Sequence, residues 1–352
     1  MKMNGNKSAI LGVGHFISAI KKIQKEISIL SASVTDTATQ SLFYNTAIEL
    51  IPYGRFNAQL VHPRKKEPFI LIDTSIVDFF GNMSALYVTL YANNNNQNVL
   101  DITEQEVIDI LFASAEIFYD GLGWESELNA IYAKKLNYNR IHEGNRQRAM
   151  TYSLASRLFI ISHEIGHLYH NQQVGQFADK SSRLGKFWND FWNALGGHML
   201  SHQKERMADI HAVEIMLQFA STYKNNPPLF FDILNGVHFC MDAIHTMQML
   251  KGKHKDVEGL KLIGVNERPT HPIGGFRISE YRDRLKKMFK DEFDSLFHPS
   301  LQYHKIVHPY IEKIVSGAVP STDYFQMKEL ARNLLEPPWV WDNNSVKNIY
   351  GI

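Results

Sequence analysis

The sequence lacks several features that would assign it to a particular class of protein. Its 352 residues include a single cysteine, Cys240, which excludes an intrachain disulfide and favours a reducing compartment. Lys and Arg number 37 against 36 Asp and Glu, so no basic excess points to nucleic acid. No stretch reaches the ~18 consecutive apolar residues of a spanning helix, and the N-terminus is a weak match to a signal peptide. We therefore expect a cytoplasmic protein with no membrane span and no nucleic-acid partner.

Internal repeats and clear linkers are also absent, so a single domain over residues 1–352 is the simplest organisation. The 44% apolar and 21% charged residues are ordinary for a globular protein and exclude wholesale disorder. We expect an α+β, predominantly helical fold with a small antiparallel sheet. Its predicted parts are an N-terminal helical segment (1–50), a small β region (51–100), a helical core (101–300) and a C-terminal extension (301–352).

Hydrophobic periodicity places the individual elements. The β region contains a predicted hairpin, with strands at Phe56–Val61 and Phe69–Asp73, and a possible third strand at Tyr87–Tyr91. A helix from Thr103 to Tyr119 follows Asp101, a plausible cap. Further helices are predicted at Ile10–Leu30, 148–172, 199–222, 228–250 and 273–292, and the tail around Pro337–Trp339 is predicted to be extended.

An HExxH motif lies inside the helix predicted at 148–172. His163 and His167 are one helical turn apart, so both imidazoles can reach one ion from the same face. Glu164 is rotated roughly 100° around the helix and can reach a bound water instead of the ion. The pattern predicts two ligands and one base, although the same residues would also suit an ordinary amphipathic helix.

The next long helix offers a third ligand. Glu205 and Asp209 are again one turn apart, and catalytic zinc sites usually take three protein ligands and leave one position open. Glu205 would complete a His₂Glu site, and Asp209 would accept the free ring N–H of a ligating histidine. The alternative is that both carboxylates form a solvated face with Lys204 and Arg206.

The metzincin pattern, which takes a third histidine from the same motif, is not met, because His170 and Gln173 stand where Gly and His would be needed. We expect His170 to be a neighbour of the site, and His202 and His211 remain alternative ligands. Gly166, which weakens the helix by ~1 kcal/mol relative to Ala, predicts either simple tolerance or a close approach of another backbone.

A third element lies downstream, at Thr270-His-Pro272 and Arg277-Ile278. His271 in a turn before a helix could approach the metal and stabilise an oxyanion, and Arg277 could pair with a buried carboxylate such as Asp209.

The three motifs together resemble the gluzincin set of HtpX-type and CAAX-prenyl-type metallopeptidases, and also the Lit family of phage-exclusion peptidases. The likeness covers about 115 residues, from His163 to Ile278. It implies a zincin-like core, in which the implied roles are zinc ligation (His163, His167, Glu205), catalysis (Glu164, His271) and support (Asp209, Arg277). HtpX-type and CAAX-prenyl-type enzymes are embedded in membranes, so the missing spanning helix favours the soluble, Lit-like branch.

These observations predict a zinc-dependent endopeptidase, with Zn2+ as cofactor and a protein or peptide as substrate. Phe69–Ile72 could pair with an extended substrate by strand addition. Two alternatives remain: a zinc-binding pseudo-peptidase or interaction protein, and a metal hydrolase acting on a non-peptide bond. Neither cleavage specificity nor oligomeric state follows from the residues.

Overall fold

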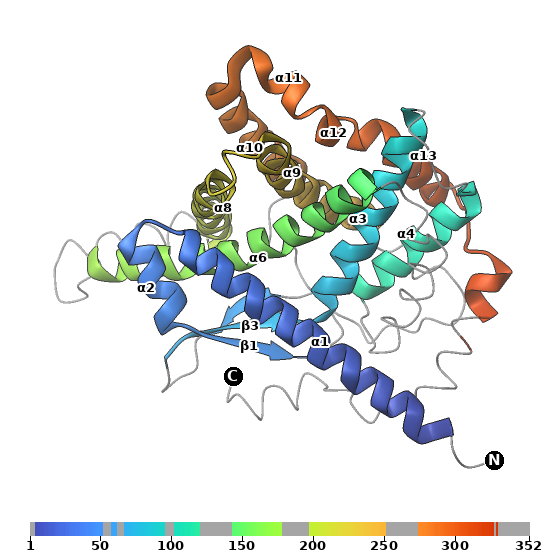
Figure 1. The fold of residues 1–352 in the computed structure, drawn as a ribbon, viewed down its shortest axis with the longest axis horizontal. Coiled ribbons are helices and arrows are strands. Elements are labelled where there is room, and N and C mark those ends of the chain that lie inside the picture. The colour runs from blue at the N-terminus through green and yellow to red at the C-terminus, as the bar shows by residue number, and fades with distance from the viewer. Residues whose placement is uncertain are drawn as a thin grey trace.

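The computed structural model describes residues 4–51, 58–61, 67–95, 102–119, 143–177, 197–250, 274–326 and 329, with side chains except at 4–17, 119, 171–177, 197–202 and 274–277. These parts of the chain are predominantly helical (Figure 1). The long helices are α1 (Asn4–Ser33), α2 (Thr37–Asn45), α3 (Ser75–Asn94), α4 (Glu104–Tyr119), α6 (Glu143–Phe177), α8 (Gly197–Ser221), α9 (Pro227–Leu250), α10 (Gly274–Phe289) and α13 (Tyr303–Val315). Short helices η2 (Lys290–Glu292), α11 (Phe293–Leu296) and α12 (His298–Leu301) connect α10 to α13.

The helices predicted from periodicity are confirmed at α1, α4, α6, α8, α9 and α10, with small shifts at their ends. The start of α4 is capped by Thr103 and Glu106. The Glu106 N–H donates to Thr103 Oγ1 at 3.3 Å and the Thr103 N–H donates to the Glu106 carboxylate at 2.9 Å, which is a reciprocal capping box. Asp101 and the tail around Pro337 lie outside the described residues.

The sheet has three strands in the order β1-β3-β2: β1 (Ala47–Ile51), β2 (Ala58–Val61) and β3 (Phe69–Asp73). The predicted antiparallel pair β2–β3 is confirmed. The expectation of an antiparallel sheet is wrong, because β1 was missed and pairs parallel to β3, which makes the sheet mixed. All five residues of β3 are buried between its two neighbours, as expected of a central strand.

The third predicted strand, Tyr87–Tyr91, is also wrong, because these residues lie inside α3. Their β-branched and aromatic side chains favour a strand in isolation. In the fold, α3 is surrounded by other helices, and its residues are buried on every side from Asn82 to Ala92. A helix that is apolar all round has no 3.6-residue pattern, so tertiary packing decided its structure.

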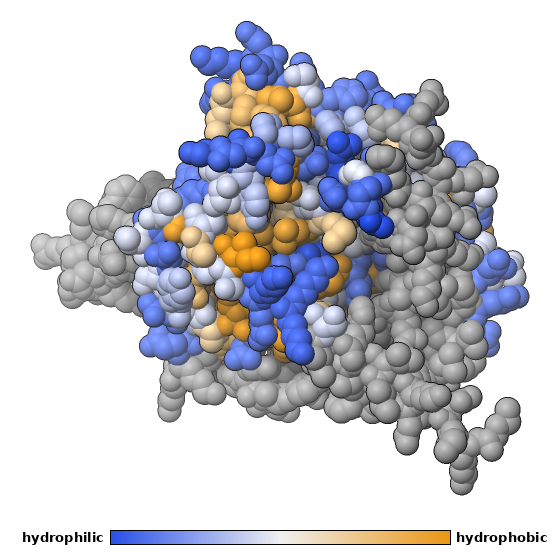
Figure 2. Space-filling model, viewed as in Figure 1, coloured by the Kyte–Doolittle hydropathy of each residue, from blue (hydrophilic) through white to orange (hydrophobic). Residues whose placement is uncertain are grey.

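The fold is organised around α6, which packs against α3, α8 and α9 and also contacts β2, α1 and α2. In Figure 1 this helix crosses the middle of the molecule, with the sheet and α1 on one side and α8, α9 and α10 on the other. None of the described helices is long and apolar enough to cross a membrane. On the face shown in Figure 2, hydrophilic residues interrupt the apolar ones over the described surface.

Candidate metal centre

Two helices supply the residues of the HExxH and Glu205 motifs. α6 presents His163 and His167 one turn apart, and α8 presents Glu205 and Asp209 one turn apart. The two helices touch backbone to backbone at Gly166, where a Cβ atom would lie 2.7 Å from the carbonyl oxygen of Ala208. Of the two interpretations of Gly166, the structure therefore supports the close approach of a second backbone. This contact brings the side chains of both helices close together.

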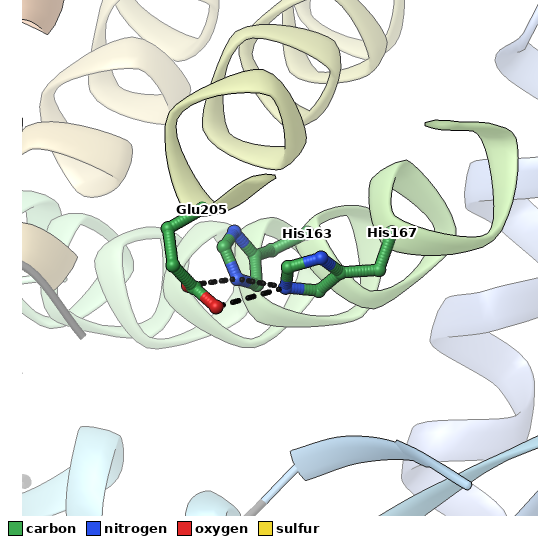
Figure 3. Close-up of side chains that lie close together, drawn as sticks. All are labelled: His163, His167 and Glu205. Atoms are coloured by element: carbon green, nitrogen blue, oxygen red, sulfur yellow. Dashed lines mark hydrogen bonds and ion pairs between the residues drawn. The ribbon is translucent and has the colours of Figure 1, made fainter. Parts of the chain in front are cut away.

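The side chains of His163, His167 and Glu205 point at one another (Figure 3). His163 Nε2 lies 3.1 Å from Glu205 Oε2 and 3.1 Å from His167 Nε2, and His167 Nε2 lies 3.4 Å from Glu205 Oε1. An ion bound tetrahedrally at ~2.0–2.1 Å separates its ligand atoms by about 3.3–3.4 Å. The observed spacings are close to that requirement, with the two imidazoles facing different oxygens of the Glu205 carboxylate, so these three residues could hold a metal ion.

Asp209 orients His163 from behind. Its Oδ1 lies 2.8 Å from His163 Nδ1, which places the imidazole proton on Nδ1 and leaves the lone pair of Nε2 directed at His167 and Glu205. A carboxylate that accepts the second ring N–H is the usual partner of a metal-binding histidine. The structure therefore puts Asp209 in the supporting position expected from the sequence.

The centre is shielded from solvent. His163, Glu164, Glu205 and Asp209 are all buried, while His167 keeps 17% of its side chain exposed. Three carboxylates therefore lie in or beside a buried cluster of two imidazoles. A divalent cation would offset this concentration of negative charge, which is otherwise costly to remove from water.

Among the described side chains, the other histidines near the motifs are not part of the group. His211 is engaged with α2, since its Nε2 lies 3.1 Å from Thr39 Oγ1, and its ring stacks on Tyr169 at 4.3 Å. Burial lowers the pKa of His211, and burial followed by the charge of Lys204 lowers the pKa of His170. The side chain of His202 lies outside the described residues. Within the described parts of the chain, His163, His167 and Glu205 form the one group with metal-binding spacing.

The downstream motif is placed only in part. His271 and the side chain of Arg277 lie outside the described residues, although Arg277 belongs to the first turns of α10. Two ion pairs join α10 to α8: Arg206–Glu280 at 2.5 Å and Glu214–Arg284 at 3.7 Å. Of the two pairs, Arg206–Glu280 is the one nearer both Glu205 on α8 and the start of α10.

Sequence reasoning missed a second polar group, in which the buried His238 and Asp242 of α9 meet the partly exposed His304 of α13 and Arg282 of α10. The available signal was an i, i+4 His–Asp pair inside an otherwise apolar helix. Sequence reasoning also missed the buried ion pair between Arg157 on α6 and Glu26 on α1, with nitrogen–oxygen distances of 2.9 and 2.5 Å. No local pattern connects residues 131 positions apart.

Fold and site together define a mostly helical α+β protein with a candidate metal centre where two helices meet. Comparison with protein-family models, with curated proteins and with solved structures finds no match for this chain.

Proposed function

We propose that the chain is a zinc-dependent endopeptidase of the gluzincin type. The observation that carries the proposal is the convergence of His163, His167 and Glu205 from two helices, with nitrogen–oxygen distances of 3.1 and 3.4 Å to the two carboxylate oxygens. Two imidazole nitrogens and one carboxylate oxygen form the His₂Glu set of catalytic zinc sites, which keep a fourth position open for water. A structural zinc site would instead use four protein ligands.

Glu164 supplies the group that separates catalysis from simple metal binding. It follows His163 on α6, is buried, and points from a different side of the helix than the two imidazoles. A bound zinc ion would polarise the scissile carbonyl and make a water molecule more acidic. Glu164 would then take the proton of the attacking water and deliver it to the leaving amine.

The substrate would be a protein or peptide segment in an extended conformation. Strand addition to Phe69–Ile72 is excluded, because β3 is already paired on both sides. β2 is the better candidate, since it is an edge strand of the sheet and packs against α6, the helix that carries the two histidines. His271 and Arg277 keep their proposed roles of holding the oxyanion and pairing with a buried carboxylate. We also propose a cytoplasmic location, because a chain with a single cysteine forms no intrachain disulfide and suits a reducing compartment.

Metal content tests the site itself. We expect one zinc per chain by elemental analysis in the wild-type protein and in Glu164→Gln, and strongly reduced zinc in Glu205→Ala. Glu214→Ala is the matched control, because this carboxylate lies on the same helix but is exposed; it should keep its zinc. Absence of metal from every sample after incubation with zinc would refute the proposal.

Activity tests the reaction. Zinc-loaded wild-type protein should cleave members of a library of fluorescence-quenched peptides, and Glu164→Gln should not, although it retains the metal. Equal cleavage by both proteins would exclude Glu164 as the base. A zinc-loaded wild-type protein that cleaves no peptide would favour a metal-binding protein without peptidase activity.

A further inference from the structure

A stacked pair of rings joins α6 to α8 one turn beyond the contact of Gly166 with Ala208. The phenol ring of Tyr169 on α6 and the imidazole of His211 on α8 have centroids 4.3 Å apart and planes 17° from parallel. Stacked rings attract one another within a narrow range of separations and orientations. This pair therefore holds α8 to α6 at a second place, beside the backbone contact at Gly166.

Helix α2 holds the imidazole of this pair from its edge. Thr39 is buried, and its Oγ1 lies 3.1 Å from His211 Nε2. The same hydroxyl lies 2.5 Å from Asp36 Oδ2, which also accepts the Thr39 N–H at 2.8 Å and caps the start of α2. Because α2 itself packs against α6 (Figure 1), it connects His211 back to the helix that carries the two proposed histidine ligands.

The donors and acceptors in this chain of contacts have one consistent assignment. The hydrogen bonds from Thr39 lower the pKa of Asp36, so its carboxylate is ionised at neutral pH and accepts the hydroxyl proton of Thr39. Burial lowers the pKa of His211, against the weaker opposing charges of Glu214 and Asp36, so its ring is neutral and has a single N–H. That proton lies on Nε2, which donates to Thr39 Oγ1. The tautomer of His211 is therefore fixed by α2.

The position of His211 on α8 is linked to that of Glu205. Each of them is three residues from Ala208, in opposite directions along the helix, which is ~4.5 Å of helix axis. Ala208 is the residue at which α8 meets the backbone of α6, at Gly166. A tilt of α8 about this contact that displaces His211 therefore shifts Glu205 by a similar distance in the opposite direction.

We propose that Thr39 and His211 are positioning residues for the metal centre. Their hydrogen bond and the stack on Tyr169 fix the tilt of α8 that places Glu205 opposite the two proposed histidine ligands. We call Thr39, Tyr169 and His211 the α2 brace. The inference rests on the proposed zinc site and adds a third helix to it. Without the brace, α8 would sample more tilts, and only the fraction of molecules with the correct tilt would bind zinc at full affinity.

Zinc affinity, measured by competition with a chromophoric chelator, tests the brace. Thr39→Val exchanges the hydroxyl for a methyl group of similar size, and we expect affinity to fall ~2–10-fold, which is the effect of one hydrogen bond on an equilibrium. Thr39→Ser keeps the hydroxyl and should bind zinc as the wild-type protein does. His211→Phe keeps a ring against Tyr169 but loses the donor, so its affinity should fall as in Thr39→Val. Combining Thr39→Val with His211→Phe should weaken zinc binding no further, because both changes remove the same hydrogen bond.

Thr246→Val is the matched control. Thr246 is also buried, and its hydroxyl lies 3.0 Å from the Tyr303 hydroxyl in a contact between α9 and α13 that involves neither ligand helix. Both threonine-to-valine variants should lower the stability of the metal-free protein in chemical denaturation, but only Thr39→Val should lower zinc affinity. The absorption spectrum of the Co2+-loaded protein gives a second readout, because it depends on coordination geometry. It should change in Thr39→Val, return to the wild-type form in Thr39→Ser and stay unchanged in Thr246→Val.

Wild-type zinc affinity and a wild-type cobalt spectrum in both Thr39→Val and His211→Phe would overturn the brace and leave the proposed zinc site intact. An equal loss of affinity in Thr246→Val, or additive losses in the double variant, would overturn it as well. A wild-type protein that takes up no zinc would refute the proposed metal centre itself, and the brace with it. The wild-type measurement therefore distinguishes the two failures.

Discussion

The contact between Gly166 and Ala208 predicts that a single added methyl group will disturb the metal centre. In Gly166→Ala the new Cβ would lie 2.7 Å from the Ala208 oxygen and 2.9 Å from its Cα, both of them backbone atoms that cannot rotate away. Ordinary contacts begin near 3.4 Å, so α6 and α8 must separate by about 0.5 Å or more. Glu205 is less than one turn from Ala208 on α8 and would move with it.

The expected magnitudes differ for stability and for metal binding. Overpacking costs ~1–3 kcal/mol, whereas Gly to Ala inside a helix gains ~1 kcal/mol, so the metal-free protein should lose only ~0–2 kcal/mol. The ligand atoms, now 3.1–3.4 Å apart, would be spread beyond the tetrahedral spacing. Displacing the support of a metal ligand typically costs ~10–100-fold in affinity. We therefore expect zinc affinity to fall by at least ~10-fold.

Two other glycines provide matched controls. In Gly236→Ala the new Cβ would lie 2.7 Å from Ala155 Cβ, which overpacks α6 against α9. The contact between α6 and α8, the two helices that carry the proposed ligands, is not involved. This variant should lose stability but keep its zinc affinity. Gly81 on α3 has nothing within 4 Å of its virtual Cβ, so Gly81→Ala should be neutral or stabilising.

Competition with a chromophoric chelator gives the zinc affinity of each variant, and chemical denaturation of the metal-free protein gives its stability. Wild-type zinc affinity in Gly166→Ala would refute the argument that this backbone contact sets the ligand spacing. An equal loss of affinity in Gly236→Ala would also refute it, because the effect would then be a general consequence of overpacking α6.

Three further predictions concern other buried charges. Asp209→Asn should weaken zinc binding ~10–100-fold in the same competition assay, because the acceptor facing His163 Nδ1 loses its charge; unchanged affinity would contradict this role. Glu26→Gln should destabilise the fold by ~3–5 kcal/mol in urea denaturation because it leaves the Arg157 charge buried and unpaired, whereas replacing both residues by apolar ones should cost much less. The pKa of Asp242 is lowered to about 2, so its contribution to the free energy of unfolding is complete above its unfolded pKa of ~3.9 and is lost as the pH falls through 2. In Asp242→Asn, the free energy of unfolding should therefore change less between ~pH 4 and 2 than in the wild-type protein.

The metal-centre geometry was predictable because its information is local. His163 and His167 share a helix face by spacing alone, and the same spacing puts Glu205 and Asp209 together on another helix. Gly166 allowed two interpretations, simple tolerance or a close neighbouring backbone, and only the structure distinguished them by showing the contact with Ala208.

The errors lie where long-range packing determines structure. β1 was missed because its parallel partner is more than 20 residues away, and parallel strands are not joined by a short turn that the sequence would reveal. α3 was read in part as a strand because Tyr87–Tyr91 carries no amphipathic pattern once every face is buried. The interhelical polar contacts of Asp242 with His304 and of Arg282 with His238 depend on how three helices dock. Residue spacing within any one helix does not contain that information.

The division of the proposed ligands between α6 and α8 also determines when during synthesis a metal could be captured. A nascent chain that has completed α6 offers only the two nitrogens of His163 and His167. The carboxylate of Glu205 and the supporting Asp209 emerge about 40 residues later and must then dock through the contact at Gly166. At a synthesis rate of ~5–20 residues per second, the incomplete site exists for ~2–8 seconds. Metal loading at the proposed site would therefore be a late event that depends on the docking of two helices.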